Sequence, residues 1–370
     1  MDRSARAASL LPSLPSGSRI LIIRLRSIGD IILLTPALRL LKEWRPDLPV
    51  TVLIEDRFRA LLENNPDADE ILLLEAGGRL AKLGSRLHIL RRIRQEKFQL
   101  CLNLHGGPTS ATLTAWSGAR WKAGFAHFRR RRLYDFLVPD ARTILNQTKI
   151  HTAEHQASAF FHLGLPRAGI PAARMIVTAA QRAEWAEKRA RLGLSAEKPY
   201  VLIHPTALYA TKQWAPENFA ALGNYLETEA GLCTLYSCGP GEAGVLAAVE
   251  KAAGKKPIRC LDGAPLGCFA AALTGARLFV GNDSGPAHMA AALGLAGVVI
   301  FSSSSSIIWG PWRPRAPWRI VQNPFDCNPC PGDRCYRFAQ PECIQSVSFE
   351  QVRSAVEAVL AETATPAGSS

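Results

Sequence analysis

Residues 20–38 read ILIIRLRSIGDIILLTPAL. A run of strand-forming residues, Ile20 to Ile23, leads into a turn that contains Gly29, and an apolar stretch of helical character follows. Strand, glycine turn and helix is the arrangement of a nucleotide-binding loop, yet this stretch contains neither G-x-G-x-x-G nor a P-loop pattern. Asp30 stands where such a loop would offer a bare glycine to a phosphate. The segment therefore predicts an α/β sheet with a carboxylate at the end of a strand.

The same alternation of apolar strand and helix continues along the chain. We expect strands near 19–23, 49–54, 70–73, 99–102, 122–125, 199–203, 232–237, 257–260, 277–281 and 297–302. We expect helices near 30–44, 56–64, 80–96, 109–117, 174–193, 216–230, 240–253, 266–274 and 286–293. Strands that alternate with helices form parallel sheets with helices on both faces. The pattern therefore predicts two doubly wound α/β domains.

The boundary between the two domains is expected in GLPRAGIPAA, residues 164–173, which is rich in glycine and proline. The stretch 1–17 contains Pro12 and Pro15, which interrupt its short apolar patch, so we expect a disordered leader rather than a secretory signal. A C-terminal helix should begin after Ser348. The predicted domains are 18–170 and 171–347, followed by a helix and tail at 348–370.

Charge and composition narrow the class of protein. The 370 residues are 48% hydrophobic, and no window approaches the apolar length of a membrane span, which favours a globular, cytoplasmic protein. The net charge of +13 is uneven, because residues 1–170 carry 26 lysines and arginines against 15 acids, whereas residues 171–370 carry 18 against 16. The excess is densest at Arg91, Arg92, Arg94 and Lys97 and at 129–132. Such a basic half indicates an anionic partner, unless the arginines only solvate a surface. No nucleic-acid-binding motif accompanies it, so a nucleic-acid partner is not expected.

The segment 278–288, LFVGNDSGPAH, is the most informative for chemistry. A buried strand ends in a turn at Asp283, Ser284 and Gly285, and proline at 286 suits the first position of a helix. Free N–H groups at a helix start favour an anion, with the Ser284 hydroxyl and His288 as further donors. The alternative is that Asp283 is a plain helix cap and His288 an interior histidine.

The pattern D-S-G-P-x-H-x-A-A-A-L-G resembles the donor-site signature of glycosyltransferase family 9, the ADP-heptose:lipopolysaccharide heptosyltransferases. The opening R-x-x-x-x-G-D-x-x-x-x-x-P at 24–36 is similar to the first loop of that family. HPTALYATKQWAPENFAAL at 204–222 and CGPGE at 238–242 resemble two further family segments. The resemblance runs in order through almost the whole chain.

The resemblance implies a GT-B fold, in which two Rossmann-like domains face a central cleft. The N-terminal domain would take the acceptor, and the C-terminal domain would bind the sugar nucleotide. The implied reaction is inverting transfer of heptose from ADP-heptose to Kdo or heptose of the lipopolysaccharide inner core. The enzyme would act as a peripheral protein at the inner face of the inner membrane, on an anionic lipid A/Kdo acceptor. The alternatives are a GT-B transferase with another sugar nucleotide or acceptor, and a non-catalytic nucleotide-binding protein.

The resemblance also assigns roles to individual residues. Asp30 occupies the position of the general base, although a helix-capping carboxylate is the alternative. The implied donor-binding residues are Thr206, Lys212, Glu242, Asp283, Ser284, Gly285 and His288. The implied acceptor-binding residues are Ser27, Gly29, His105, Arg129 and Arg130. No metal is required, because a lysine and a helix end can stabilise the leaving diphosphate in place of a divalent ion.

Two loops need separate comment. Five consecutive serines, 302–306, stand where the family commonly has Phe-Gly-Pro-Thr after a strand. That departure leaves the contacts of this loop with the donor open. His105 lies in LHGGPTS, 104–110, where the family has a polar, glycine-containing loop that faces the acceptor.

The nine cysteines fall into two groups. Five are scattered and are typical of small buried apolar residues. The other four form a tight cluster, Cys327, Cys330, Cys335 and Cys343, whose short spacing suits reduced structural thiols, a structural zinc ion or a disulfide. None of these alternatives makes the cluster catalytic.

Overall fold

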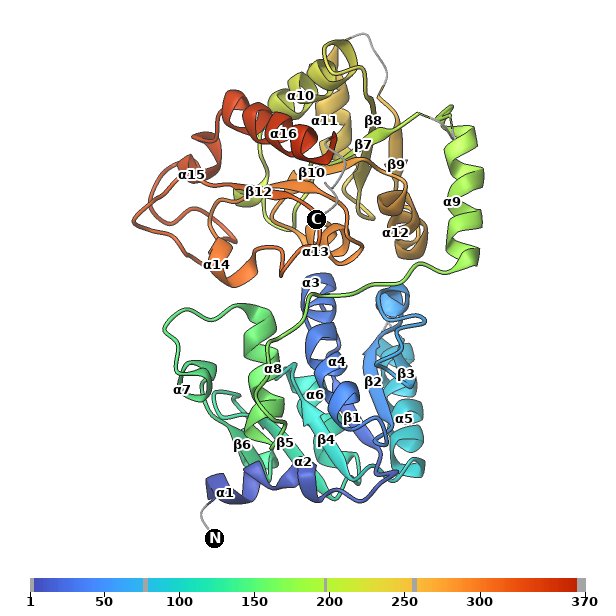
Figure 1. Ribbon diagram of the computed structural model, residues 1–370, viewed down its shortest axis with the longest axis vertical. Coiled ribbons are helices and arrows are strands. Elements are labelled where there is room, and N and C mark those ends of the chain that lie inside the picture. The colour runs from blue at the N-terminus through green and yellow to red at the C-terminus, as the bar shows by residue number, and fades with distance from the viewer. Residues whose placement is uncertain (1–2, 76–78, 196–197, 255–257, 365–370) are drawn as a thin grey trace, which may run out of the picture. The chain divides into compact units, whose positions relative to one another are not determined.

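The computed structural model describes residues 3–75, 79–195, 198–254 and 258–364. Residue 257 of the expected strand at 257–260 and residues 365–370 of the expected tail lie outside them. The chain divides into two compact units, Met1–Ile176 and Val177–Ser370 (Figure 1). The sequence predicted this boundary after residue 170, within the glycine- and proline-rich stretch 164–173. The structure places it six residues later, after Ile176. No helix of the described residues is long and apolar enough to span a bilayer.

The N-terminal unit contains a sheet of six parallel strands. In the order β3-β2-β1-β4-β5-β6, its strands are β3(Glu70–Leu74), β2(Val50–Glu55), β1(Ile20–Ile23), β4(Leu100–Asn103), β5(Trp121–Phe125) and β6(Phe136–Val138). Strand β1 pairs with β4 so that Ile23 lies opposite Asn103. The chain therefore reverses direction across the sheet between these two strands, which makes a topological switch point at their carboxyl ends.

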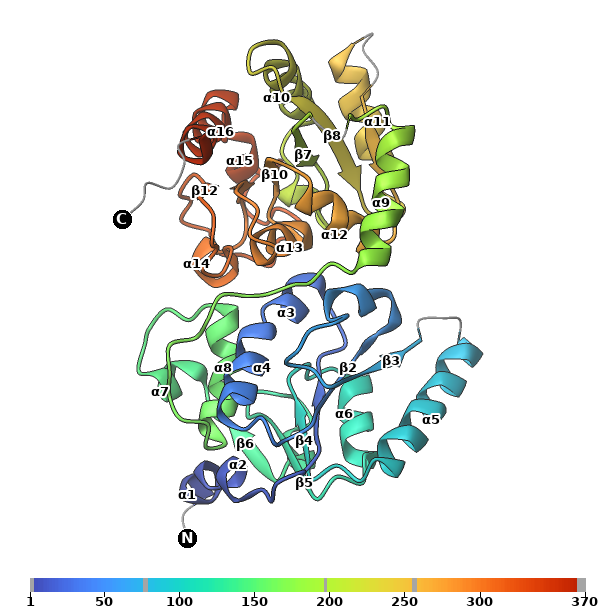
Figure 2. The same ribbon diagram turned by 45° about the vertical axis from the view of Figure 1, so that its right-hand side comes forward.

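Helices cover both faces of this sheet. Its helices are α1(Arg3–Ala8), α2(Leu10–Ser13), α3(Ile28–Ile32), α4(Thr35–Trp44), η1(Asp56–Leu61), α5(Arg79–Gln95), α6(Pro108–Trp116), η2(Arg131–Leu133), α7(Ala141–Leu145) and α8(Thr152–His162). Helices α4 and α8 pack together on one face, and α5 and α6 lie on the other (Figure 2). Ile89 and Ile93 of α5 and Leu113 of α6 join the strand residues in one buried apolar cluster.

The expectation of a disordered leader is wrong. Helices α1 and α2 occupy the leader, and Leu10, Leu11 and Leu14 are buried. The Leu11 amide donates to the Leu163 carbonyl at 2.9 Å, so the leader is held against the end of α8. The prolines shorten the helices of this segment, but its leucines still bury enough apolar surface to order it.

The helix expected at 30–44 is two helices. Pro36 lacks an N–H, so the turn before it cannot continue the hydrogen-bond ladder. The Thr35 hydroxyl instead donates to the Ile32 carbonyl at 2.7 Å and satisfies the end of α3. The helix expected at 56–64 is the 3-10 segment η1, and the helix expected from 174 begins only at α9(Ala179–Arg191), capped by Thr178.

The C-terminal unit repeats the sheet. In the order β12-β11-β10-β7-β8-β9, its parallel strands are β12(Trp318–Val321), β11(Gly297–Ile300), β10(Leu278–Asn282), β7(Tyr200–His204), β8(Cys233–Cys238) and β9(Cys260–Asp262). Counted from β7, this is the strand order of the first sheet, so β7 and β10 flank a second switch point. Strands β6 and β12 were not predicted, because each is a short strand at a sheet edge.

The remaining elements enclose the core of this unit. Besides α9, its helices are η3(Ala210–Lys212), α10(Pro216–Thr228), α11(Ala243–Ala253), α12(Leu266–Thr274), α13(Gly285–Ala292), α14(Ser306–Trp309), α15(Glu342–Gln345) and α16(Phe349–Ala364). The predicted C-terminal helix is confirmed as α16, whose first turn is capped by Ser348 and Gln351. Val352, Val356 and Val359 of this helix are buried in the core.

Candidate functional site

In the N-terminal unit, the loops after β1 and β4 meet at the switch point. Asp30 follows β1, and His105 follows β4, so both lie at the edge of the sheet where open α/β folds bind ligands. The two residues are 75 positions apart in the sequence, and the parallel pairing of β1 with β4 brings their loops together. The expected placement of both residues at the carboxyl ends of strands is confirmed.

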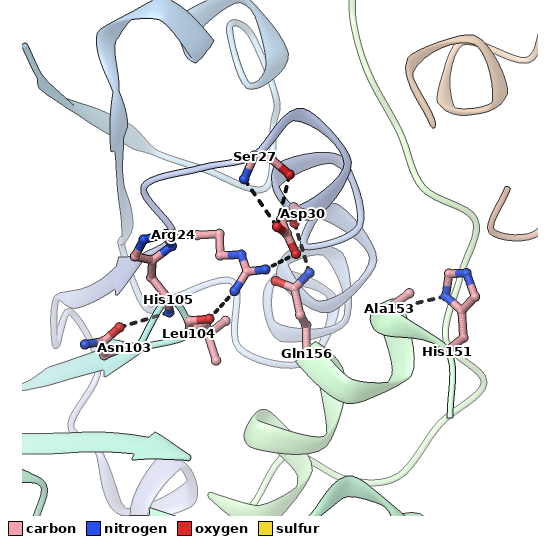
Figure 3. A network of polar contacts seen from close by, with 9 residues as sticks. All are labelled: Arg24, Ser27, Asp30, Asn103, Leu104, His105, His151, Ala153 and Gln156. Atoms are coloured by element: carbon pink, nitrogen blue, oxygen red, sulfur yellow. Dashed lines mark hydrogen bonds and ion pairs between the residues drawn. The ribbon is translucent and has the colours of Figure 1, made fainter. Parts of the chain in front are cut away.

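Asp30 is held by a set of polar contacts at the start of α3 (Figure 3). Its carboxylate accepts from the Ser27 amide at 3.3 Å and from the Ser27 hydroxyl at 3.1 Å, which forms a capping box. The Arg24 guanidinium forms an ion pair with the other carboxylate oxygen. The Asp30 side chain is 16% exposed, so the ion pair leaves part of the carboxylate accessible. Gly29 lies inside α3 rather than in the expected turn, and it is buried.

Arg24 and Gln156 fix this loop, and sequence reasoning did not single them out. The Arg24 guanidinium donates to the Leu104 carbonyl as well as to Asp30, so it joins the loops after β1 and β4. Burial lowers the pKa of Arg24 to about 10, which leaves it charged at neutral pH. The Gln156 side chain on α8 donates to the Asp30 carbonyl at 2.9 Å. The arginine that opens the first motif was a signal for Arg24, but no local pattern indicates Gln156.

His105 sits on a loop that a buried asparagine shapes. The Asn103 side chain accepts from the amides of His105 at 2.9 Å and of Gly106 at 3.1 Å. Burial, together with the nearby charges of Arg24 and Arg26, lowers the pKa of His105 to about 4. The imidazole is therefore neutral at neutral pH, and it can donate or accept one hydrogen bond at each nitrogen.

Arg129 and Arg130 follow β5 and are exposed. They belong to an open hollow of about 660 Å³ that is lined by residues 129–133. The guanidinium of Arg130 approaches the Thr112 hydroxyl at 3.5 Å. Strand β5 pairs with β4 in parallel, so this arginine run begins at the same edge of the sheet as the Asp30 loop. The structure thus supports an anion-binding character for the segment without assigning it a ligand.

The switch point of the C-terminal unit is built around Lys212 and Asp283. Lys212 lies on the loop after β7 and Asp283 on the loop after β10, and their side chains form an ion pair at 2.7 Å. Asp283 also accepts a hydrogen bond from Ser304, which is one of the five serines after β11. Three loops at the carboxyl edge of the sheet therefore converge on one carboxylate. Asp283 thus organises the site rather than only capping a helix.

The position of Lys212 is fixed by the tryptophan two residues later. The Trp214 amide donates to the Asn282 side chain at 3.1 Å, and its indole N–H donates to the Val347 carbonyl at 2.8 Å. Asn282 also donates to the Pro205 carbonyl at 2.8 Å, at the other end of the same loop. The spacing of lysine and tryptophan in the second motif therefore has a physical reason, because the buried indole anchors the segment that carries the lysine.

The start of α13 carries donor groups without partners. The Ser284 hydroxyl is inaccessible to solvent and has no hydrogen-bond partner among the described residues, and the same is true of the Ser303 hydroxyl. Gly285 begins the helix, and His288 is buried within its second turn. Buried hydroxyls without partners are costly in a folded protein, and such groups commonly mark a place where a ligand binds. With the Gly285 amide at the helix start, this region suits an anion.

Thr206 and Glu242, two of the implied donor-binding residues, are held by contacts within the C-terminal unit. Thr206 is completely buried, and its hydroxyl contacts His204 Nε2 at 2.9 Å, while His204 Nδ1 contacts the Ser237 hydroxyl at 3.0 Å. Burial lowers the pKa of His204 to about 4, so this chain of contacts is neutral. The Glu242 carboxylate folds back onto the Gly239 amide at 2.8 Å and closes its own turn. Neither contact tests the donor-binding roles that the resemblance implies.

The clustered cysteines lie beside the loop of Lys212. All four thiols are free and line a pocket of about 380 Å³ together with Thr211 and Ser303. Burial and the neighbouring thiols raise the pKa of Cys343. Within the described parts of the chain, no three histidine, cysteine or acidic side chains are arranged to hold a metal ion. The segment is attached to the serine loop, because the Cys330 amide donates to the Ser303 carbonyl at 2.9 Å.

Known proteins resemble this chain over most of its length. The family model for glycosyltransferase family 9 (heptosyltransferase) matches residues 86–337. Lipopolysaccharide heptosyltransferase 3 of Escherichia coli strain K12 is 27% identical over 78% of this chain and 83% of its own length. Lipopolysaccharide heptosyltransferase 2 of Salmonella typhimurium is 23% identical over 78% of this chain and 83% of its own length.

Solved structures agree on the fold. The family 9 glycosyltransferase of Veillonella parvula has a TM-score of 0.82 at 24% identity, with 94% of this chain and 99% of that chain covered. ADP-heptose lipopolysaccharide heptosyltransferase II of Escherichia coli has a TM-score of 0.75 at 18% identity, with 94% and 100% covered. The fold is thus of the GT-B class with two Rossmann-like units, and the matched segment includes the switch-point loops of the C-terminal unit. The chain belongs to glycosyltransferase family 9 and is a glycosyltransferase.

Proposed function

We propose that this enzyme transfers heptose, with inversion, from ADP-heptose to the inner core of lipopolysaccharide. The acceptor is Kdo or an earlier heptose on an anionic lipid A core, and the reaction takes place at the cytoplasmic face of the inner membrane. The names of the related heptosyltransferases support the sugar and the acceptor class. The alternative of a non-catalytic nucleotide-binding protein loses its support with the family assignment.

The observation that carries the proposal is the Lys212–Asp283 ion pair beside the start of α13. Next to it are two hydroxyls without partners, those of Ser284 and Ser303, and the Gly285 amide at the helix start. A nucleoside diphosphate supplies the acceptor oxygens that these donors lack. Negative charge grows on the diphosphate as its bond to the sugar breaks, and donors fixed in advance lower the energy of that state.

Lys212 changes partner in this scheme. Without donor, its ammonium group is paired with Asp283. With donor bound, the ammonium contacts the diphosphate, and Asp283 keeps the lysine oriented from behind with the help of Ser304. The lysine and the helix end together take the part that a divalent ion plays in other transferases, so the proposal requires no cofactor.

Asp30 is the proposed general base. The oxygen of the acceptor hydroxyl forms a bond to the anomeric carbon, the bond from that carbon to the diphosphate breaks, and the hydroxyl proton passes to the Asp30 carboxylate. The ion pair with Arg24 and the bonds from Ser27 hold the carboxylate in one orientation before the reaction.

The acceptor contacts are proposed on the same edge of the N-terminal sheet. Ser27 and Gly29 frame Asp30, His105 offers a neutral imidazole, and Arg129 and Arg130 offer positive charge to the phosphate and carboxylate groups of an acidic core. The cationic N-terminal half is the reason that we assign the acceptor to it.

The test is incubation with ADP-heptose and a panel of truncated lipid A cores, with ADP release and product mass as the readouts. A heptose adduct on one of these cores is the expected result. Failure with every core would reject the heptosyl transfer. If the enzyme instead transfers sugar from a different sugar nucleotide in a parallel panel, the proposed donor is wrong and the proposed mechanism still applies.

A further inference from the structure

Ten cationic side chains of the N-terminal unit form ion pairs with acidic partners among the described residues. Arg19 and Arg92 both pair with Glu70 and with Glu96. Further pairs join Arg39 to Glu43, Lys42 to Asp69, Arg45 to Asp47, Arg57 to Glu55 and Arg142 to Asp140. The positive excess of this unit therefore does not come from these residues.

Part of the unpaired charge lies on α5. Arg86, Arg91 and Arg94 of α5 are exposed, and none of them forms an ion pair with a described residue. Arg92 lies on the flank of α5 that faces Glu70 of β3. Ile89 and Ile93 face the core, so Leu87, Arg91 and Arg94, at helical spacing, form the stripe that points away from it.

Helix α6 continues this surface. Pro108, Thr112 and Trp116 are exposed at intervals of one helical turn, opposite the buried residues of α6. On one side the Arg86 guanidinium donates to the Thr109 hydroxyl at 3.1 Å, which joins α5 to α6. On the other side Arg130 approaches Thr112, which links the surface to the arginine run of 129–132.

Two large apolar side chains protrude from this basic surface. Trp116 is 62% exposed and Leu87 is 51% exposed, and each lies on a stripe that carries arginines or polar groups. We call Arg86, Leu87, Arg91, Arg94, Thr112 and Trp116 the α5–α6 face. An exposed tryptophan among unpaired cations is unfavourable in water alone, but it suits the boundary between lipid headgroups and acyl chains.

We propose that the α5–α6 face docks on an anionic lipid bilayer. The arginines would contact the phosphates of the headgroups, and Trp116 and Leu87 would enter the interface between them. The inference rests on the proposed function in one respect, since an acceptor that is anchored in a membrane must be reached from its surface. The proposed reaction itself does not require that the enzyme bind lipid through the α5–α6 face.

The chemistry of the face favours lipid over nucleic acid. Proteins that bind single strands present several aromatic rings on which successive bases stack. Trp116 is the one exposed aromatic residue of the α5–α6 face, and its apolar companion, Leu87, is aliphatic. A single ring beside an aliphatic side chain and fixed cations is instead the composition of an interfacial anchor.

The test is co-sedimentation of the full-length enzyme with vesicles. One set contains phosphatidylcholine alone, and the other contains equimolar phosphatidylcholine and phosphatidylglycerol. The enzyme should bind the anionic vesicles and not the neutral ones, and added salt should weaken binding. In the double variant Arg91→Gln/Arg94→Gln, apparent affinity should fall about twentyfold, because each cation near an anionic surface contributes about fivefold. Trp116→Ser should weaken binding by about tenfold.

Arg92→Gln is the matched control. It removes the same charge from the same helix, but Arg92 is paired with Glu70 and Glu96 and lies on the other flank of α5. Its binding should stay within about twofold of the parent enzyme. A loss of about fivefold in Arg92→Gln, the loss expected for any one cation of this helix, would reduce the effect to net charge and overturn the proposal. Absence of binding to anionic vesicles, or tighter binding to an RNA oligomer through the same residues, would also overturn it.

A second assay separates this inference from the reaction. The double variant should keep full turnover on a deacylated, water-soluble acceptor and lose turnover on the same acceptor embedded in anionic vesicles. Normal turnover of the variant on the embedded acceptor would reject the docking surface. If the parent enzyme transfers heptose to no acceptor, the reaction fails, while the vesicle experiment still decides the surface.

Discussion

The two units use the same sheet in different ways at their switch points. In each, the first strand of the unit lies beside the fourth, and the fourth strand ends in a fully buried asparagine, Asn103 or Asn282. Asn103 binds the amides of its own loop, at His105 and Gly106. Asn282 instead reaches to the loop after the neighbouring strand, where it contacts Pro205 and Trp214. The amide group of Asn103 also donates to Thr114 and Tyr134, so this asparagine joins its own loop to α6 and to the segment after β5, whereas Asn282 joins β10 to the loop after β7.

Each switch point also pairs an aspartate with a cation, and the pairs differ in what holds them. Asp30 is paired with Arg24, which directly follows β1 on the same loop. Arg24 also donates to the Leu104 carbonyl. Asp283 is paired with Lys212 from a different loop and accepts a hydrogen bond from the Ser304 hydroxyl on a third loop. The lysine is a single ammonium group at the end of a flexible chain, so it can turn to a ligand, whereas the doubly bound arginine cannot do so as easily. We therefore expect the aspartate to act on the substrate in the first unit and the cation in the second.

The largest expected effect is that of Asp30→Asn. Turnover should fall about a thousandfold, since loss of a general base typically costs between about a hundredfold and ten-thousandfold. The dissociation constant for ADP-heptose should change less than about twofold, because the donor is assigned to the other unit. Steady-state kinetics and calorimetric titration with ADP-heptose would measure the two quantities.

Asp140→Asn provides the control for this prediction. Asp140 caps α7 and pairs with Arg142, so it shares the helix-end position and the arginine partner of Asp30 without its place at the switch point. Turnover should remain near that of the parent enzyme. If Asp30→Asn also keeps near-normal turnover, Asp30 is only the cap of α3 and the base lies elsewhere.

Lys212→Ala should have the next largest effect and should show the opposite division. Hydrogen bonds to charged groups contribute about 1.5–3 kcal/mol, so kcat/KM should fall on the order of a hundredfold and ADP should bind at least about tenfold more weakly. Lys251→Ala, an exposed lysine on α11, removes the same charge outside the site and should change neither quantity. Normal ADP affinity in Lys212→Ala would place the diphosphate away from the Asp283 loop.

Local sequence patterns predicted the loops at the two switch points, but they did not predict which side chains of distant segments contact one another there. The turn after β1, the lysine before Trp214 and the segment from Asp283 to His288 are contiguous in sequence, so motifs identify them. The contact of Gln156 with Asp30 joins residues on different elements, and its hydrogen bond depends on how α8 packs. Pairing between distant side chains leaves no local periodicity to detect.

The errors have similar physical causes. Strands β6 and β12 lie at sheet edges and expose Leu137 and Ile320, so they lack the fully buried apolar run that marks the central strands. The leader was predicted to be disordered from its prolines, yet Leu10, Leu11 and Leu14 are buried because α8 provides a surface for them. The spacing of the clustered cysteines left reduced thiols, zinc and a disulfide open, and in the structure all four thiols are free and line a pocket.

The comparison further predicts a dependence of stability on pH that comes from the C-terminal switch point. Burial lowers the pKa of His204 to about 4 in the folded protein, whereas the unfolded chain binds the proton at the ordinary pKa of about 6.5. The folded state therefore binds fewer protons, so the stability contributed by neutral His204 is present above pH 6.5 and is lost as the pH falls towards 4. Between about pH 7 and about pH 5 the loss should be about 2 kcal/mol.

Denaturant unfolding of the parent enzyme and of His204→Gln at both pH values would measure this contribution. The variant cannot be protonated, so its loss between the two pH values should be smaller by that amount. Burial also lowers the pKa of His105 at the N-terminal switch point to about 4, so His105 contributes a dependence of the same sign, which His204→Gln leaves in place. An unchanged pH dependence in His204→Gln would show that His204 is not buried in its neutral form.

The smallest expected effect distinguishes hydroxyls with partners from those without. Ser284→Ala should weaken ADP binding about fivefold, because a donor to the diphosphate is lost, and should leave the unfolding free energy unchanged or slightly higher, because a buried hydroxyl without a partner is removed. Ser158→Ala in α8 is the matched opposite, since its hydroxyl donates to the His155 carbonyl at 2.7 Å. That variant should lose about 1 kcal/mol of stability and bind ADP normally. If Ser284→Ala is destabilised and binds ADP like the parent enzyme, the hydroxyl is a structural group, and the start of α13 does not hold the diphosphate through it.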